Sequence, residues 1–353
     1  MQSFRALQRH LGLTPAPILT QLAVIEQGRG RQEAFRRQHP EALKTLLEVA
    51  RIQSVESSNA LENVTAPRKR IRELVEQKTT PKNRPEAEIA GYRAVLDLVH
   101  SSAESIPFVP SVVEQLHRDL YQFTGNRNAG RWKRLDNRVI EELPDGTVID
   151  RFVPLSALET PAAMAELHER FADAWEEGTY HRLLLTGAYV LDFLVIHPFS
   201  DGNGRMARLL TLLLLYRSGY EVGRFISLEK LIEQTRESYY AALQASTAGW
   251  LEGVHTLEPW LSYFLGILVG ASSEFESRAG VVVGGRGAKE AAIKSFIRSR
   301  ATARVTVEEI RQAVPSASDV YIREVLRKLR DQGALRQEGK GPYAGWERLH
   351  TDF

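Results

Sequence analysis

A twelve-residue stretch between two apolar runs constrains this chain more than any other part of its sequence. Residues 197–208 read His-Pro-Phe-Ser-Asp-Gly-Asn-Gly-Arg-Met-Ala-Arg, and they lie between the apolar segments 183–196 and 209–216. Pro198 ends a helix because it lacks a backbone N–H and disfavours helical geometry at His197. The sequence therefore predicts two buried helices that are joined by a tight loop.

The loop carries the residues of a polyphosphate site. Gly202 and Gly204 flank Asn203 and let the backbone N–H groups approach a ligand closely. The next helix begins near Gly204, so its unpaired N–H groups and the positive end of its dipole face the same point. Arg205 and Arg208 are three residues apart and lie on one side of that helix. We expect these five residues to bind a polyphosphate.

Two further residues of the loop suggest chemistry. Asp201 would repel phosphates directly, but it fits as a ligand of a Mg²⁺ ion that bridges them. His197 is expected at the rim, where an imidazole acts as a general base on an incoming hydroxyl. The alternative is a helix cap with salt bridges, which each residue taken singly would suggest.

The stretch resembles the signature of the Fic family, His-x-Phe-x-Asp/Glu-Gly-Asn-Gly-Arg-x-x-Arg, and matches it at every specified position. The resemblance implies a helical Fic domain that transfers a nucleotidyl group, most often AMP from ATP to a protein hydroxyl. The target would be a Ser, Thr or Tyr of another protein or of the chain itself. His197 would accept the hydroxyl proton, and pyrophosphate would leave.

A second, shorter pattern lies far upstream of the loop. Ser58, Glu62 and Asn63 resemble the inhibitory pattern of the same family, Ser/Thr-x-x-x-Glu-Gly/Asn. The resemblance implies that Glu62 pairs with Arg208 and occupies the place of the ATP γ-phosphate. On its own the segment is a helix end with Asn63 as a C-cap. An alternative function is removal of AMP, with Glu62 positioning a water molecule.

Amphipathic helical spacing dominates the chain, so the predicted fold class is mainly α. We expect a helical N-terminal region with the inhibitory helix at residues 1–105 and the Fic core at 106–279. A glycine-rich linker is expected at 280–287, and a winged-helix domain at 288–353. Helices are predicted within the core at 109–123, 161–175, 183–195 and 250–269, whereas 65–84 reads as a solvated connection.

One β-like segment interrupts the helices. Residues 138–140 and 147–149 flank the turn signal Pro144-Asp145-Gly146, which predicts a hairpin within 130–154. The resemblance implies that this hairpin is the family's flap, which aligns the target by main-chain pairing. A plain surface hairpin is the alternative. Lys133 departs from the Gly-x-aromatic-Arg that is more common there.

Two other sets of residues are candidates for the site. Tyr239, Tyr240 and Leu243 resemble the family's downstream Tyr-Tyr-x-x-Leu region and could wall the adenine, although aromatic residues at helical spacing also pack cores. His117 lies on an expected helix, where a lone histidine is typical of packing or of the surface. It was therefore left out of the predicted site.

The C-terminal segment reads as helix, helix–turn–helix and hairpin, which resembles a winged helix. Residues 288–353 hold thirteen Lys and Arg against nine Asp and Glu, and Arg323, Arg327, Lys328 and Arg330 lie on the third helix. These cations could face DNA phosphates, but they alternate with acids. Protein interaction or dimerisation is the alternative, and one reading of the whole chain is a DNA-binding regulator with a nucleotide-sensing Fic site.

The composition excludes several classes of protein. The chain has 353 residues and a net charge of +2, so its overall charge does not attract nucleic acid or membranes strongly. It has no cysteine, which excludes disulfides, thiolate nucleophiles and cysteine metal sites. It shows neither a signal-peptide core nor an apolar run of membrane-spanning length. The expectation is a soluble cytoplasmic protein.

Overall fold

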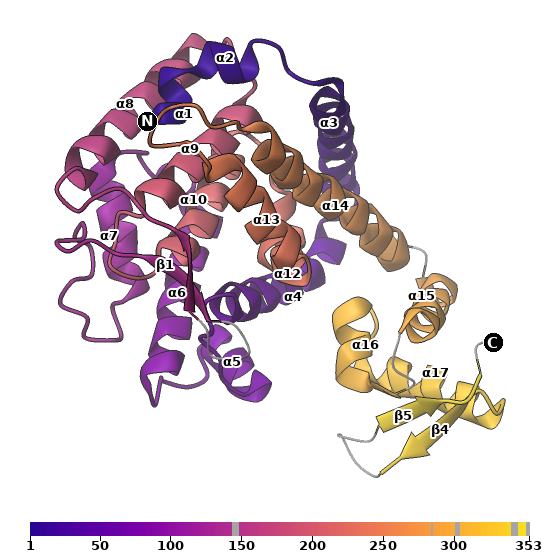
Figure 1. The fold of residues 1–353 in the computed structure, drawn as a ribbon. Coiled ribbons are helices and arrows are strands. Elements are labelled where there is room, and N and C mark those ends of the chain that lie inside the picture. The colour runs from indigo at the N-terminus through magenta and orange to yellow at the C-terminus, as the bar shows by residue number, and fades with distance from the viewer. Residues whose placement is uncertain (143–147, 284, 301–303, 340–344, 351–353) are drawn as a thin grey trace. The chain divides into compact units, whose positions relative to one another are not determined.

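The computed structural model describes a mainly helical chain (Figure 1). The backbone is described for residues 1–142, 148–283, 285–300, 304–339 and 345–350, and the side chains for the same residues except 40–42, 140–142, 148–151, 282–283 and 285–286. The chain forms two compact units. The first comprises Met1–Gln27 with Arg51–Ala271, and the second comprises Gly28–Ala50 with Ser272–Phe353.

Helices make up nearly all of the first unit. Those that lie wholly within it are α1 (Gln2–Arg5), α2 (Leu7–Leu11), α5 (Arg68–Val75), α6 (Arg84–Ser102), α7 (Pro110–Leu120), α8 (Thr160–Glu177), α9 (Arg182–Ile196), α10 (Asn203–Arg217), α11 (Val222–Phe225), α12 (Leu228–Gln234) and α13 (Arg236–Thr247). Three longer helices belong to both units: α3 (Ala16–Gln38), α4 (Pro40–Ala60) and α14 (Glu258–Val283). Across the described residues, no helix combines the length and apolarity that a membrane crossing requires.

Helices α9 and α10 form the core of the first unit. Every residue from Leu183 to Ile196 is buried, which confirms the predicted buried helix. Helix α10 buries most of its length as well, because its leucine-rich run continues to Tyr216. Helices α8 and α13 pack against α9, and α6 packs against α10 (Figure 1). The loop 197–202 is therefore fixed at the junction of two buried helices.

Some helix boundaries differ from those expected. Helix α5 forms inside the predicted connection 65–84, because Ile71, Leu74 and Val75 make a buried stripe there. The helix predicted at 250–269 begins only at Glu258, since two glycines before it have positive φ angles of 72°.

The segment predicted as a linker, 280–287, is largely helical. Helix α14 continues to Val283, and α15 (Gly285–Ser299) begins two residues later. Within the second unit, Val281 packs against the apolar cluster formed by the C-terminal elements. That burial offers a reason for the helix to extend past Gly280.

The predicted hairpin pairs β1 (Val139–Glu142) with β2 (Val148–Phe152) in an antiparallel ribbon. Val139 pairs with Phe152, and an irregularity follows before Ile140 pairs with Asp150. The turn signal Pro144–Gly146 and the first residue of the second expected strand, Thr147, lie outside the described residues.

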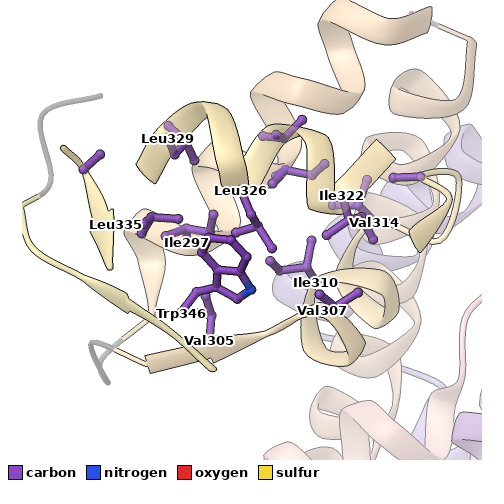
Figure 2. Packing of buried hydrophobic residues seen from close by; sticks show 14 residues of the cluster. Ile297, Val305, Val307, Ile310, Val314, Ile322, Leu326, Leu329, Leu335 and Trp346 are labelled. Carbon is purple, nitrogen blue, oxygen red and sulfur yellow. The ribbon is translucent and has the colours of Figure 1, made fainter. Parts of the chain in front are cut away.

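The C-terminal part of the second unit combines three helices with a small sheet. Its elements are α15, β3 (Arg304–Thr306), α16 (Val307–Ala313), α17 (Asp319–Asp331), β4 (Leu335–Glu338) and β5 (Gly345–Arg348). The sheet is antiparallel with the order β3-β5-β4, and strand β3 was not expected. Trp346 packs with Ile297, Val305 and Leu326 in its core (Figure 2). Of the turn expected after β4, residues 340–343 lie outside the described residues.

Candidate active site

His197 lies directly after α9, where the helix must end. Pro198 cannot continue the helix, and His197 has a left-handed φ of 52°. Its Nδ1 lies 3.1 Å from the carbonyl oxygen of Leu194. Because a carbonyl only accepts hydrogen bonds, Nδ1 carries the proton and Nε2 presents its lone pair. Burial lowers the pKa of His197 to about 4, so the ring is a neutral base near pH 7.

The lowered pKa predicts an unusual pH profile for a histidine base. In the general-base role expected for His197 the active form is the neutral ring, which persists as pH falls until the pKa of about 4 is approached. The value of kcat/KM for ATP, with magnesium saturating, should therefore be nearly level from about pH 7 to about pH 5 and fall below that. A loss of half the activity near pH 6.5, the ordinary value, would contradict the assignment.

The side chain of Asn203 holds the loop in its folded shape. Its Oδ1 accepts a hydrogen bond from the Phe199 N–H at 2.9 Å, and its Nδ2 donates to the Phe199 carbonyl at 2.7 Å. Asn203 is almost completely buried. Asn203 is one of the residues predicted from the sequence to bind phosphates, whereas in the structure its side-chain amide is bonded to the loop. Its backbone N–H lies in the first turn of α10, where N–H groups lack a partner within the helix.

His117, which the sequence analysis left out, supports the loop from α7. Its Nδ1 accepts from the backbone N–H of Gly130 at 2.8 Å, so the proton resides on Nε2. Nε2 lies 3.0 Å from the carbonyl oxygen of Asp201 and donates to it. The ring also stacks on Phe199 with a centroid distance of 3.7 Å. No pattern near His117 in the sequence reveals these partners, because they come from segments far along the chain.

Lys133 and Asn137 hold the other side of the same backbone. Lys133 Nζ donates to the carbonyl of Ile196 at 3.0 Å and to Asn137 Oδ1 at 2.9 Å, and its backbone N–H donates to Pro198. Asn137 Nδ2 donates to the Phe199 carbonyl at 3.0 Å. Burial lowers the pKa of Lys133 to about 8. The carbonyl groups of Ile196, Pro198 and Phe199 are therefore occupied by hydrogen bonds from this segment.

The two glycines of the loop serve different purposes. Gly202 is the N-cap of α10 with a φ of 80°, which a side chain would strain. Gly204 is helical, but a Cβ there would lie 2.1 Å from Oε1 of Glu62. The missing side chain at Gly204 thus admits a carboxylate to the first turn of α10. This is the position where a helix N-terminus favours an anion.

Arg208 connects this carboxylate to α4. Its Nη2 lies 2.8 Å from Glu62 Oε1, its Nε donates to Ser58 Oγ, and Nη2 also donates to the Ser58 carbonyl, both at 2.8 Å. Burial is the largest single effect on the pKa of Arg208 and would lower it, but the combined effect of Glu62, Tyr239 and Tyr92 raises the pKa above its ordinary value. The structure thus brings Ser58, Glu62 and Arg208 together, 146 to 150 residues apart in sequence.

The helix end that precedes Glu62 is anchored to a neighbouring helix. Asn63 follows the helix end with a φ of 58°, the left-handed geometry of a C-cap residue. Ser54 donates to Glu229 Oε2 at 2.7 Å, and Ser57 donates to Glu233 Oε2 at 2.8 Å. These bonds fasten the end of α4 to α12.

Arg205 occupies a different environment from the one expected. Its guanidinium donates to Glu88 Oε2 at 2.8 Å and to the Tyr121 hydroxyl at 2.7 Å, and it lies 3.4 Å from Asn59 Oδ1. Its side chain is only 1% exposed. The sequence predicts that Arg205 and Arg208 bind the phosphates side by side. In the structure Arg208 lines the pocket described below, and Arg205 ties the loop to α6 and α7.

This buried pair predicts a large effect on stability. Replacing Arg205 by leucine would remove the buried partner of Glu88 and leave it only the largely exposed Arg84, 2.9 Å away, as an ion-pair partner among the described residues, which should lower the free energy of unfolding by about 3 kcal/mol in chemical denaturation. The matched control is Arg170→Leu, since Arg170 pairs with Glu166 on the surface of α8. That change should cost below ~1 kcal/mol. Equal losses in the two variants would contradict the structural role of Arg205, and adding Glu88→Leu should restore part of the loss.

Asp201 lies at the exposed edge of the loop. Its side chain is 52% exposed, and its Oδ1 accepts from the Gly202 N–H at 2.7 Å. The nearest cations, Arg84 and Arg205, are each 3.9 Å away. Among the residues that the structure describes, no group of three or more His, Cys, Asp or Glu is arranged to hold a metal ion. A metal at Asp201 would therefore need most of its ligands from a substrate or water.

A pocket of about 710 Å³ opens in front of His197. Its lining residues come from the turn after α4, the hairpin, the end of α9 and the loop after it, α10 and α13: Glu62, Val139, Phe152, Leu194, His197, Gly204, Arg208, Tyr239, Tyr240, Leu243, Gln244 and Thr247. The three residues proposed for adenine are thus in the same pocket as the base and Arg208. Tyr239 is also almost fully buried against Trp260, so it serves the core as well as the pocket wall.

Comparison with known proteins identifies this region. Residues 107–215 match the model of the Fic/DOC family. Two curated relatives are both called protein adenylyltransferase fic-1. The one from Caenorhabditis briggsae is 34% identical to this chain over 110 residues, and the one from Caenorhabditis elegans is 39% identical over 69 residues. These alignments cover 30% and 20% of this chain, but only 19% and 11% of the relatives. The chain thus spans less than a fifth of their length.

Solved structures share the fold. A Fic family protein from Desulfovibrio desulfuricans G20 superposes with a TM-score of 0.61 at 21% identity, over 96% of this chain and 97% of that one. A Fic domain containing signaling protein from Bacteroides thetaiotaomicron VPI-5482 gives a TM-score of 0.60 at 23% identity, over 72% of this chain and 97% of that one. With its loop signature and its match to the family model, the region 107–215 is a Fic/DOC family domain.

Proposed function

We propose that this chain is a protein adenylyltransferase that moves AMP from ATP to a hydroxyl side chain of a target protein, and that Glu62 restrains it. The family match and the partial similarity to the fic-1 adenylyltransferases support a nucleotidyl-transfer enzyme. The observation that carries the finer proposal is local. A carboxylate oxygen of Glu62 lies against Gly204 in the first turn of α10, beside Arg208 and in the pocket of His197.

The reaction needs one base and one anion site. A Ser, Thr or Tyr hydroxyl of the target gives its proton to Nε2 of His197 while its oxygen attacks the α-phosphorus of ATP. The bond from that phosphorus to the bridging oxygen of the β-phosphate breaks, and pyrophosphate leaves with the electron pair. The N–H groups at the start of α10 and the guanidinium of Arg208 stabilise the phosphate charge. Tyr240 and Leu243 border the space left for adenine.

Asp201 is the residue that would hold Mg²⁺. Its half-exposed carboxylate at the loop edge suits an ion that takes one or two protein ligands and completes its shell with phosphates and water. When bound, the ion would neutralise part of the phosphate charge. The backbone around Asp201 is fixed by His117, so the carboxylate approaches the phosphates from a defined position.

Glu62 inhibits by occupying the phosphate position. Its carboxylate takes one donor of Arg208 and adds a negative charge where the γ-phosphate would lie. ATP would then bind weakly or in an unproductive pose. The anchoring of α4 through Ser54 and Ser57 keeps this carboxylate in place.

Labelled nucleotides test the transfer. The chain is incubated with Mg²⁺ and ATP that carries the label on either the α- or the γ-phosphate, and the label on protein is measured after denaturing electrophoresis. AMP transfer predicts protein label from α-labelled ATP only. Label from γ-labelled ATP would mean that a phosphate is transferred instead and would overturn the proposal.

A second activity on the same site is removal of AMP from a modified protein. Glu62 lines the pocket that contains His197, so its carboxylate could orient a water molecule toward a bound AMP group. The test is release of AMP from a pre-modified target. Release that is lost in Glu62→Gly supports removal, and release that persists in that variant contradicts it.

A further inference from the structure

Helix α17, one of the C-terminal elements, has a polar face that contributes no residue to the pocket of His197. Helices α16 and α17 are joined by a short turn, and α15 and the three-stranded sheet enclose the same apolar cluster (Figure 2). The order is helix, strand, helix, helix, strand, strand. In a helix–turn–helix the second helix is the one that can enter the DNA major groove, and here that helix is α17.

Helix α17 has an apolar face and an opposite polar face. Ile322, Val325, Leu326 and Leu329 are buried in the cluster. On the other side Val320 is 75% exposed, which is unusual for a β-branched apolar side chain at the start of a helix. Spacings of three and seven residues place Arg323 and Arg327 beside Val320.

The cations of α17 differ in whether they are neutralised. Lys328 lies 2.9 Å from Glu290 of α15, and Arg330 lies 2.7 Å from Asp331. In contrast, Arg323 and Arg327 have no ion pair or hydrogen bond to their side chains among the described residues. The acid nearest the helix start, Asp319, is partly offset by Arg311 at 3.7 Å.

Charge is also distributed unevenly along the chain. Residues 288–353 carry thirteen Lys and Arg and nine Asp and Glu, whereas the rest of the chain carries 33 and 35. The excess of positive charge therefore belongs to the C-terminal elements. A net cationic module with unneutralised arginines on one helix is the electrostatic pattern of a nucleic-acid surface.

We propose that Val320, Arg323 and Arg327 form a surface that binds the major groove of double-stranded DNA. A guanidinium can donate two hydrogen bonds to guanine O6 and N7 or bind a backbone phosphate, and an exposed valine can contact a thymine methyl group. The three side chains lie within two turns of one helix, the length that a recognition helix presents to a groove. This activity is independent of nucleotidyl transfer at His197.

The experiment uses the full chain and a pool of random 30-base-pair duplexes. Bound duplexes are selected over several rounds, and the affinity for an enriched duplex and for its scrambled form is measured by fluorescence anisotropy at several salt concentrations. Arg323→Ala and Arg327→Ala should each weaken binding to the enriched duplex about tenfold or more. An arginine that contacts only phosphate should also reduce the slope of log affinity against log salt by about 1.

Lys328→Ala is the matched control, because it removes one positive charge from the same helix but from a residue already paired with Glu290. It should weaken binding less than threefold. Failure to enrich any duplex, or an equal loss in all three variants, would overturn the proposal. Arg323→Gln and Arg327→Gln, checked by thermal unfolding, replace any alanine variant that does not fold. A change in molecular mass by light scattering, without DNA binding, would instead assign this surface to protein association and overturn it too.

Discussion

Replacing His197 by alanine is expected to lower the rate of AMP transfer by a factor of about 10² to 10⁴, the usual contribution of a general base. The reason is geometric. Nδ1 is committed to the Leu194 carbonyl, so Nε2 is the ring atom that remains to take the hydroxyl proton. The measurement is the initial rate of label transfer from α-labelled ATP in a Glu62→Gly background, where the phosphate position is open.

The affinity for ATP separates a lost base from a damaged loop. In the structure the backbone of the loop is held by Asn203, His117 and Lys133, so His197→Ala should leave the Kd for ATP within about threefold of its original value. The matched control is His181→Ala, which alters the opposite end of α9. There the side chain accepts a hydrogen bond from Leu183 N–H as an N-cap. Its loss should cost about 1 kcal/mol of stability and leave the transfer rate unchanged. Comparable rates in His197→Ala and His181→Ala would remove His197 from the mechanism.

The sequence alone was sufficient to predict the parts of this molecule that depend on local pattern. The all-round apolar character of 183–196 predicts a buried helix, and α9 is buried along its length. The pattern Thr306-x-x-Glu309 predicts a capping box, and both of its hydrogen bonds are present. The mainly α fold class and the Fic resemblance are confirmed. In each case the information lies within a window of a few turns.

Roles set by distant partners could not be predicted in the same way. The signature places Arg205 and Arg208 on one helix, but it does not show that Glu88, 117 residues earlier, claims the first of them. Likewise, the sequence does not distinguish His117 from other helical histidines, because its tautomer is fixed by the Gly130 N–H and its Nε2–H donates a hydrogen bond to the Asp201 carbonyl. The role of a buried polar side chain depends on the groups that it contacts in the folded structure. The periodicity of the sequence does not indicate which groups those are.

Replacing Glu62 by glycine is expected to tighten ATP binding by ~10-fold to 100-fold. The variant loses the charge-assisted bond between Glu62 and Arg208, which competes with the nucleotide and corresponds to ~1.5 to 3 kcal/mol. Transfer from α-labelled ATP at low ATP concentration should rise to a similar extent. The change removes the Glu62 carboxylate, which lies beside Gly204 and accepts a hydrogen bond from Arg208. Arg208 remains in position, because its Nε and Nη2 still donate to Ser58.

Two comparisons assign this gain to the charge at the phosphate position. Glu62→Gln keeps the size of the side chain but removes its charge, so it should recover only part of the affinity, since the amide still fills the space beside Gly204. Glu56→Gly makes the same substitution on α4 at a residue whose carboxylate pairs with Arg68 at the surface, and it should leave ATP binding unchanged. If Glu56→Gly activates as strongly as Glu62→Gly, a loosened α4 is the cause. If neither variant binds ATP more tightly, Glu62 does not compete with ATP, and its bond to Arg208 serves the fold alone.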